Sequence, residues 1–421
     1  GSIGYVEEEF FVSGTARTFT TANPSTAPYT TRIFVIRPAS AERFNGTVLV
    51  EWDNVTAQAA FSPMFTWTHP LLFRGVEDGG GYAFVSVSAQ AAGVCCSPLS
   101  HRLWDPVRYA PLSHPGDDYS FDIYSQAIQS FLAPGPVDPL GGLSVERVIA
   151  TGQSQSASRL HTYVNRVHDQ VGLVDGFLVD AGGSKQFEVE PSDPVIHVLS
   201  EDGFSAPDPN RLGHPNYRLW EIPGASHNDA DTARHIDFGG LARNSVDTPK
   251  FPYEQEEDLH RFGMHYGEQG PSTFAGCQVL GQGGNEFPRR YAVMAALDHL
   301  NRWLTDGTPA PQPPRVTYDE AGNVVRDAFG HPLGGVRLPP IDVPVARYFA
   351  TTCALFGHTV ALDAATLLEL YPTHQHYVAA MHAATAAAVS RGEMLAADGE
   401  ELMGLAQRSH IPFWVDPPAA P

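Results

Sequence analysis

Three kinds of residue that could together perform acyl transfer occur in a fixed order along the chain. Ser154 comes first, the adjacent carboxylates Glu201 and Asp202 come next, and His227 follows. A serine that attacks a carbonyl carbon needs a histidine within hydrogen-bonding reach to take its proton, and that histidine needs a carboxylate to orient it. These residue types in this order predict a nucleophile, an acid and a base that cleave an acyl bond.

The residues around Ser154 predict a sharp turn between a strand and a helix. An apolar, β-branched run at 148–151 enters the pentapeptide 152–156, which reads Gly-Gln-Ser-Gln-Ser, and a helix-forming run follows at 157–167. In an elbow of this kind, small residues let the strand and the helix approach closely, and a strained backbone exposes the serine hydroxyl. The glycine fits this pattern, whereas Ser156 stands where a second glycine is usual.

The candidate acids and the candidate base also follow predicted strands. The apolar run 194–199 precedes Glu201 and Asp202, and the run 217–222 leads into the Gly-x-x-His loop that ends at His227. Because the carboxyl ends of parallel strands share one edge of a sheet, all these side chains are expected to meet Ser154 there.

An acyl-transfer site further needs backbone donors for the oxyanion that forms during the reaction. The N–H of Gln155, in the first turn of the helix after Ser154, is one candidate. The second donor is expected from the loop after the buried strand 47–51, and therefore from Asn54 or Val55. Asn54 could equally be an ordinary turn residue.

Strands and helices alternate along the first part of the chain, which predicts the α/β class with a mostly parallel central sheet flanked by helices. A helix is expected at 119–132 with Asp118 as its cap. We expect a core at 1–310, an insertion at 228–288 that can fold over the site as a cap, and an extension at 311–421. The extension reads as short strands followed by helices that either pack on the core as structure or form a lid.

The composition narrows the possible partners. The 421 residues carry a formal net charge of −21, which disfavours binding to nucleic acid or to an anionic membrane surface. No apolar run approaches the roughly 20 residues of a membrane span. The expected partner is a small neutral or cationic molecule, and the sequence gives no indication of an oligomeric state.

The cysteines and histidines show no metal-binding spacing, so we expect neither a metal nor a cofactor. Cys95 and Cys96 are adjacent and are interpreted as two thiols in a loop, because a disulfide between neighbours is rare. Cys277 and Cys353 could form a disulfide. This cysteine usage favours export slightly over a cytoplasmic location.

Three stretches, at 50–56, at 218–227 and at 285–291 leading into 297–303, resemble the α/β-hydrolases. More narrowly, the chain is similar to a bacterial family of α/β-hydrolase-domain proteins with a Gly-x-Ser-x-Ser elbow. The resemblance implies the α/β-hydrolase fold and a carboxylesterase activity that forms an acyl-enzyme. It also places a glutamate after Ser or Thr at the acid position, so Glu201 is preferred and Asp202 stays the alternative.

Other functions remain open at this stage. The same triad could cleave an amide, a lactone or a polyester, and a hydrolase-like protein could bind ligands without catalysis. A metal-dependent hydrolase is a further alternative that chelators would test. Trp52, Trp67 and Trp104 could line an acyl pocket or could be core residues.

Overall fold

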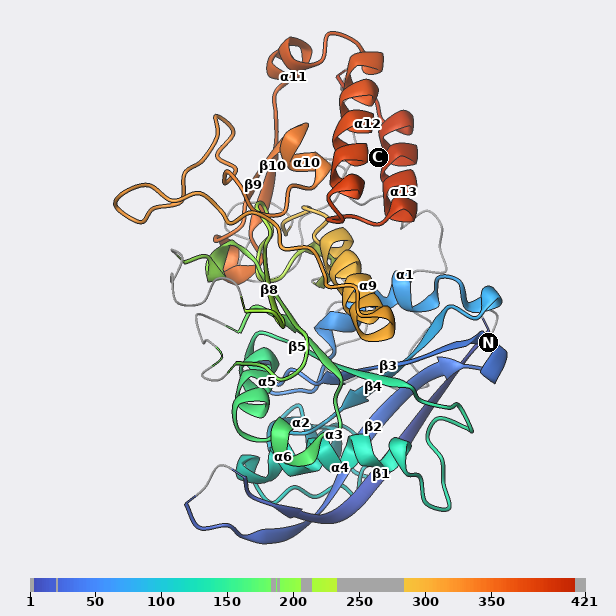
Figure 1. The fold of residues 1–421 in the computed structure, drawn as a ribbon. Helices are drawn as coiled ribbons and strands as arrows, with labels where there is room; N and C mark the ends of the chain where they lie inside the picture. Colours follow the sequence, from blue (N-terminus) through green and yellow to red (C-terminus); the bar gives the residue numbers. More distant parts are fainter. Residues whose placement is uncertain are drawn as a thin grey trace, which may run out of the picture.

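The computed structural model describes residues 4–19, 22–182, 187, 190–205, 214–232 and 284–412. In these parts of the chain, eight strands form one sheet in the order β1-β2-β4-β3-β5-β6-β7-β8 (Figure 1). The pairs β1–β2 and β2–β4 are antiparallel, and every later pair in that order is parallel. The strands are β1 (Tyr5–Arg17), β2 (Thr26–Pro38), β3 (Phe44–Trp52), β4 (Gly81–Val87), β5 (Arg147–Gln153), β6 (Gly176–Asp180), β7 (Val195–Leu199) and β8 (Tyr217–Glu221).

Helices follow most of the parallel strands, as the alternation in the sequence predicts. The α-helices are α1 (Pro63–Phe73), α2 (Ala91–Val94), α3 (His101–Trp104), α4 (Ser120–Leu132), α5 (Gln155–Arg166), α6 (His168–Val171), α9 (Arg290–Asp306), α10 (Pro339–Asp342), α11 (Ala364–Leu370), α12 (His374–Ser390) and α13 (Ala396–Arg408). A second, two-stranded sheet pairs β9 (Ala346–Phe349) with β10 (His358–Ala361) in antiparallel orientation.

The large sheet separates two hydrophobic cores. In β3, Val48 and Val50 pack in the core that α4 and α5 cover, whereas Leu49 packs in the core that α1 and α9 cover. Successive side chains of a strand point to opposite faces, so a strand covered on both faces reads as a continuous apolar run. Trp52 and Trp67 are fully buried, one in each core, and are therefore core residues.

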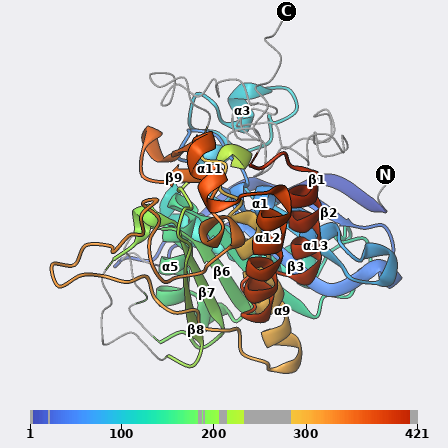
Figure 2. The same cartoon turned by 90° about the horizontal axis from the view of Figure 1, so that it is seen from above.

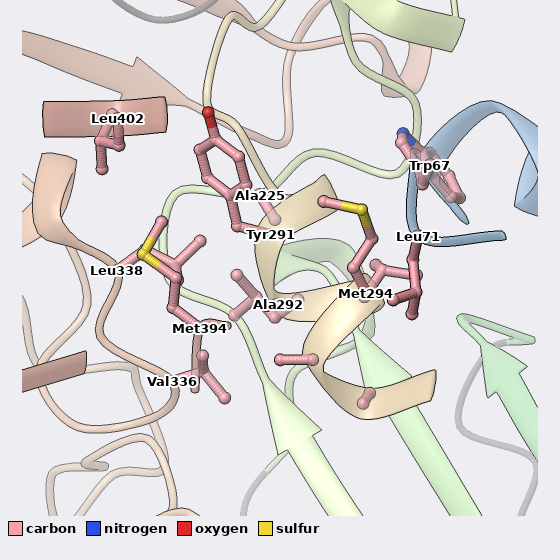
Figure 3. Packing of buried hydrophobic residues seen from close by; sticks show 14 of the residues in the cluster. Trp67, Leu71, Ala225, Tyr291, Ala292, Met294, Val336, Leu338, Met394 and Leu402 are labelled. Atoms are coloured by element: carbon pink, nitrogen blue, oxygen red, sulfur yellow. The ribbon is translucent and has the colours of Figure 1, made fainter. Parts of the chain in front are cut away.

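The C-terminal helices pack on one side of this core. Figures 1 and 2 show α12 and α13 side by side beyond α9. One continuous cluster contains Tyr291 and Met294 of α9, Leu338 and Met394 of the later segments, and Leu402 of α13 (Figure 3). The residues after 310 thus contribute to the same core as the sheet. The boundary at 310 and the cap at 228–288 stay predictions, because most of that insertion lies outside the described residues.

An ion pair also joins α13 to the core. The buried Asp398 carboxylate accepts a hydrogen bond from Arg74 at the end of α1, while its Oδ2 atom has no partner among the described residues. Burial raises the pKa of Asp398 to about 6, although the Arg74 charge opposes this shift.

The starts of the helices differ in whether a side chain caps them. Asp363 and Thr373 accept hydrogen bonds from the first turns of α11 and α12, as their side chains are expected to do. The prediction that Asp118 caps α4 is wrong, since a 3-10 turn at Asp117–Tyr119 leads directly into the helix and no side chain caps it.

Candidate active site

Ser154 lies in the sharp turn that the sequence predicts between β5 and α5. Its φ of 60° and ψ of −112° fall outside the regions that ordinary L-residues occupy. The turn is so tight that a Cβ on Gly152 would lie 3.0 Å from the Ser156 hydroxyl oxygen. Ser156 is buried, and its hydroxyl is hydrogen-bonded to the backbone of Gln153. A small polar residue therefore stands in place of the usual second glycine, and its hydroxyl links the start of α5 to the end of β5.

His227 follows β8 and faces a carboxylate at the end of β7. The His227 Nδ1 atom lies 2.8 Å from Oδ2 of Asp202. The second oxygen of Asp202 accepts a hydrogen bond from the Ser200 hydroxyl. Asp202 thus contacts the imidazole on the ring nitrogen at which an orienting carboxylate acts in serine hydrolases.

The neighbouring carboxylate, Glu201, points away from His227, so the structure does not bring the preferred candidate acid to the imidazole and brings the alternative, Asp202, instead. Glu201 Oε1 accepts the Gly224 N–H at 2.8 Å, and Oε2 accepts from Arg326 at 2.7 Å. Glu201 and Asp202 belong to one 3-10 turn after β7. They therefore lie at the predicted strand end, but their side chains face in different directions. Glu201 holds the turn that precedes His227.

The same contacts separate the acidities of the two carboxylates. Burial acts to raise the pKa of Asp202, but the hydrogen bond and charge of His227 outweigh it, and the pKa lies below its usual value. Burial raises the pKa of Glu201 above its usual value despite the opposing Arg326 charge. Asp202 is accordingly the carboxylate that stays ionised most readily.

The loop after β3 lies against the elbow, and the backbone N–H groups of its two candidate donors have different partners. The N–H of Asn54 donates to the Phe61 carbonyl at 2.9 Å, so Asn54 is not a backbone donor for a ligand. The N–H of Val55 faces the Gln155 side chain, with 3.3 Å between the nitrogen and Oε1. Gln155 itself begins α5, and its own N–H lies in the first turn, where backbone N–H groups have no intrahelical partner.

Side-chain amides link the three loops of the site. Asn54 Nδ2 donates to the Gln153 carbonyl at 2.8 Å, and Gln153 Nε2 donates to the His227 carbonyl at 3.1 Å. The Ser154 N–H donates to the Asp180 carbonyl at 2.9 Å, which fixes the elbow to the end of β6. The structure therefore brings Ser154, the Asn54–Val55 loop and the His227 loop to one edge of the sheet.

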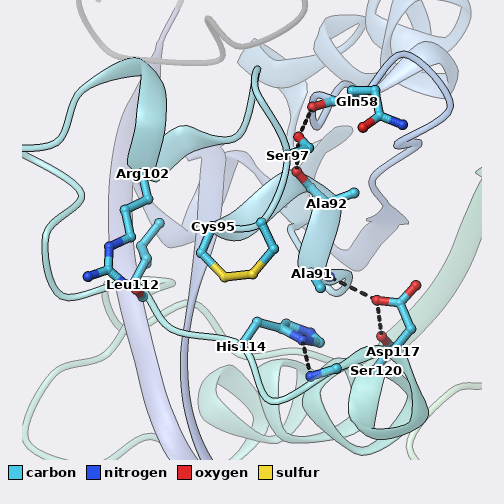
Figure 4. Close-up of a disulfide and its surroundings, with 12 residues drawn as sticks. Gln58, Ala91, Ala92, Cys95, Ser97, Arg102, Leu112, His114, Asp117 and Ser120 are labelled. Carbon is cyan, nitrogen blue, oxygen red and sulfur yellow. Dashed lines mark hydrogen bonds between the residues drawn. A yellow bond between two sulfur atoms is a disulfide. The ribbon is translucent and has the colours of Figure 1, made fainter.

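Cys95 and Cys96 form a disulfide, which corrects the interpretation of this pair as two thiols. The disulfide lies directly after α2, and the Ser97 hydroxyl next to it hydrogen-bonds to the carbonyls of Gln58 and Ala92 (Figure 4). Gln58 belongs to the loop that also carries Val55, so the disulfide lies beside the predicted oxyanion loop.

Cys353 also takes part in a disulfide, and its predicted partner Cys277 lies outside the described residues. Cys353 and Leu355 belong to a run of three consecutive residues with positive φ. The Leu355 carbonyl accepts the N–H of Asn228, the residue after His227, at 2.9 Å. Leu355 is 43% exposed.

The described residues were also expected to lack a metal site and a membrane-spanning helix. In the described part of the chain, no group of three or more His, Cys, Asp or Glu side chains could hold a metal ion. Of the closely spaced histidines in the sequence, His374 hydrogen-bonds to the Ile411 carbonyl and His376 to Thr373, while His260 and His265 lie outside the described residues. Over the same described residues, none of the helices has the length and apolar character of a membrane span.

The sequence pattern of a family described as "Alpha/beta hydrolase domain" matches residues 1–404. The chain belongs to this family. The predicted fold class is thereby confirmed, together with the resemblance on which it partly depended. None of the curated proteins matches the sequence of this α/β-hydrolase.

Solved structures with similarity to this α/β-hydrolase share little of its sequence. Esterase Est22 is 14% identical over 48% of this chain and 65% of its own, with a TM-score of 0.28. XC6422 from Xanthomonas campestris, described as an a/b serine hydrolase without lid, is 13% identical over 51% and 85%, with a TM-score of 0.31. The α/β-hydrolase thus spans slightly less than two thirds of the length of Est22.

Two residues of the site carry no recognisable signal in the sequence. Gln153 precedes the nucleophile candidate but acts through its side chain on the His227 loop. Arg289, just before α9, donates to the carbonyls of Ser226 and His227. The stretch 285–291 does contribute to the family resemblance, but nothing in it indicates contact with a loop more than 60 residues earlier.

Proposed function

We propose that this α/β-hydrolase cleaves carboxylic esters through an acyl-enzyme, with Ser154 as the nucleophile, His227 as the base and Asp202 as the acid. The hydrogen bond between His227 Nδ1 and Asp202 is the observation that carries the proposal. With a proton held on Nδ1 by the carboxylate, Nε2 is the nitrogen that accepts the serine proton.

The strained conformation of Ser154 supports its role as the nucleophile. A non-glycine residue with positive φ costs of order 1 kcal/mol or more, and such residues concentrate at functional sites. Ser154 directly follows Gln153, the last residue of β5, whose side chain donates to the His227 carbonyl. In the proposed mechanism the hydroxyl oxygen attacks the ester carbonyl, and His227 then protonates the leaving alcohol.

The oxyanion of the tetrahedral intermediate is proposed to lie between the N–H groups of Gln155 and Val55. The Val55 N–H contacts the Gln155 side-chain oxygen at 3.3 Å, a long neutral hydrogen bond that an oxyanion would replace with a stronger one. Both donors are backbone groups, so they are fixed before the substrate arrives. Fixed donors of this kind supply about a hundredfold or more in rate.

The surroundings of His227 support an ester with an apolar part. Leu355 is exposed beside Asn228, and the disulfide at Cys353 constrains the loop that presents it. An apolar acyl or alkyl group that covers Leu355 would gain roughly 25 cal/mol for each Å² of apolar surface removed from water.

A steady-state assay with p-nitrophenyl esters of increasing acyl length tests the proposal. Ser154→Ala is expected to abolish turnover. Ser156→Ala is the matched control, because this serine lies in the same elbow but keeps its hydroxyl on the Gln153 backbone. Hydrolysis that persists in Ser154→Ala would contradict the proposal, as would turnover of the matching p-nitroanilides without turnover of the esters.

A further inference from the structure

A buried arginine lies behind the His227 loop, outside the proposed triad. Arg289 is fully buried, and one end of its guanidinium pairs with the fully buried carboxylate of Asp180. Its Nη1 atom donates to the Ser226 carbonyl at 2.8 Å and to the His227 carbonyl at 3.1 Å. One rigid group thus joins the end of β6 to the backbone that carries the proposed base.

Asp180 is in turn attached to the nucleophile elbow. Its carbonyl accepts the Ser154 N–H at 2.9 Å, while its carboxylate holds Arg289. A continuous set of contacts therefore leads from the backbone of Ser154 through Asp180 and Arg289 to the backbone of His227. These contacts connect the two backbone segments that carry the proposed nucleophile and the proposed base.

The geometry suits arginine better than any other cation. The planar guanidinium presents several donors in a fixed arrangement, so it can bind a carboxylate and two carbonyls at once, whereas an ammonium group is a single flexible point. The guanidinium carbon lies over the Trp67 ring, 4.2 Å from the ring centroid, where the π electrons attract a cation. Trp67 is itself fixed by a hydrogen bond from its indole nitrogen to Asp229 at 2.9 Å.

Stability alone is a weak reason for such an arrangement. A buried ion pair loses its hydration, and apolar residues of similar volume often replace it without loss of stability. The two backbone carbonyls that Arg289 binds belong to the residues of the proposed catalytic loop, which points to a role in their placement.

We propose that Arg289 is a positioning residue of the active site, which with Asp180 fixes the Ser226–His227 backbone and thereby places the imidazole between Asp202 and Ser154. This inference rests on the proposed function for its effect on catalysis. Its effect on the loop itself is independent of any activity.

The adjacent residue, Arg290, provides a matched control. Arg290 is also buried and also forms an ion pair, at 2.6 Å to Glu401 of α13, whereas the hydrogen bonds to the Ser226 and His227 carbonyls come from Arg289. Removal of Arg289 leaves the fully buried carboxylate of Asp180 without its cation, whereas removal of Arg290 leaves Glu401, which is 36% exposed. The two variants can therefore lose different amounts of stability, so kcat and the exchange of the His227 loop are the readouts that distinguish a positioning role from a structural one.

The first arm of the test compares Arg289→Met, Arg289→Lys and Arg290→Met by steady-state ester hydrolysis and thermal unfolding. In Arg289→Met, kcat is expected to fall on the order of a hundredfold with little change in KM, because a small displacement of a catalytic group has an effect of that size. Arg289→Lys should recover part of kcat, since lysine can still pair with Asp180. Arg290→Met should keep kcat within a few-fold even where its Tm falls.

The second arm needs no activity and therefore separates the two proposals. Hydrogen–deuterium exchange of the peptide 222–228 is followed in Ser154→Ala, alone and combined with Arg289→Met or Arg290→Met. Faster exchange with Arg289→Met but not with Arg290→Met supports the positioning role, even if the wild-type chain hydrolyses no ester and the proposed function fails. Equal exchange in the two variants, or unchanged kcat in Arg289→Met, would overturn it.

Discussion

Exchange of each adjacent carboxylate for its amide should give opposite results at Glu201 and Asp202. In Asp202→Asn, the 2.8 Å contact to His227 Nδ1 loses its charge, and the new amide group can hold the imidazole in the wrong tautomer. The corresponding change in a well-characterised Ser-His-Asp enzyme lowers kcat by about 10⁴. We expect a fall on the order of 10³ to 10⁴, which corresponds to about 4 to 5.5 kcal/mol of transition-state stabilisation.

Glu201→Gln should leave the chemistry almost intact. The glutamine oxygen can still accept the Gly224 N–H, so the turn before His227 keeps its contact. The partner of the second oxygen, Arg326, is 40% exposed, and water can solvate its charge once the pair is lost. A change of kcat within a few-fold and a loss of stability of about 1 kcal/mol or less are expected.

The assay is the rate of p-nitrophenyl ester hydrolysis by both variants between pH 5 and 9, with circular dichroism and thermal unfolding as the control for folding. The pKa of Asp202 is held below its usual value, so this carboxylate stays ionised over that range and should not produce the acid limb of the kcat profile. As the pH falls through the lowered pKa, the stability that ionised Asp202 contributes should be lost. A large loss of kcat in Glu201→Gln with near-normal Asp202→Asn would refute the assignment.

Three further predictions concern other parts of the site and fold. In a digest made without reduction, the peptide that contains Cys95 and Cys96 should not react with an alkylating reagent. Mass spectrometry should find this peptide lighter by two hydrogens than the same peptide after reduction, and two alkylated thiols would contradict the disulfide. Gln153→Ala should lower kcat more than Gln155→Ala, because the Gln153 amide donates to the carbonyl of His227, the proposed base; equal losses of kcat in a kinetic assay would argue against that link. The raised pKa of Asp398 means that its contribution to stability is fully present below about pH 4 and is lost as the pH rises through about 6. Asp398→Asn should therefore flatten the dependence of unfolding free energy on pH in that window by roughly 3 kcal/mol, measured by denaturant titration at each pH.

The sequence allowed good prediction of those features that depend on local patterns. Ser154 lies between an apolar strand and a helix, and a close approach at Gly152 requires a small residue, so the elbow could be recognised from the residues alone. His227 follows β8 in the same way. The parallel strand order then brings these loops to one edge without further information.

The choice between the two carboxylates could not be made from local patterns. Glu201 and Asp202 follow the same strand, and their directions are decided by partners elsewhere in the chain. Arg326, 125 residues later, binds Glu201, whereas His227 binds Asp202. A sequence motif records which residues are adjacent but does not record which of them meets a distant arginine.

The contacts of Arg289 and the disulfide between Cys95 and Cys96 also could not be predicted from local sequence patterns. Arg289 meets residues 62 and 63 positions earlier, and only the packing of α9 against the sheet brings them together. Cys95 and Cys96 could not be distinguished from two free thiols, because the conformation of the short loop after α2 decides whether their sulfur atoms meet.

The central claim is that Ser154 is an activated nucleophile, and labelling with a fluorophosphonate probe tests it most directly. The wild-type chain, Ser154→Ala and Ser156→Ala would be treated in parallel, and the modified peptide would be located by mass spectrometry. We expect one label on Ser154, retained in Ser156→Ala and absent from Ser154→Ala. Labelling at another serine, or an unlabelled Ser154 in a folded protein, would contradict the account.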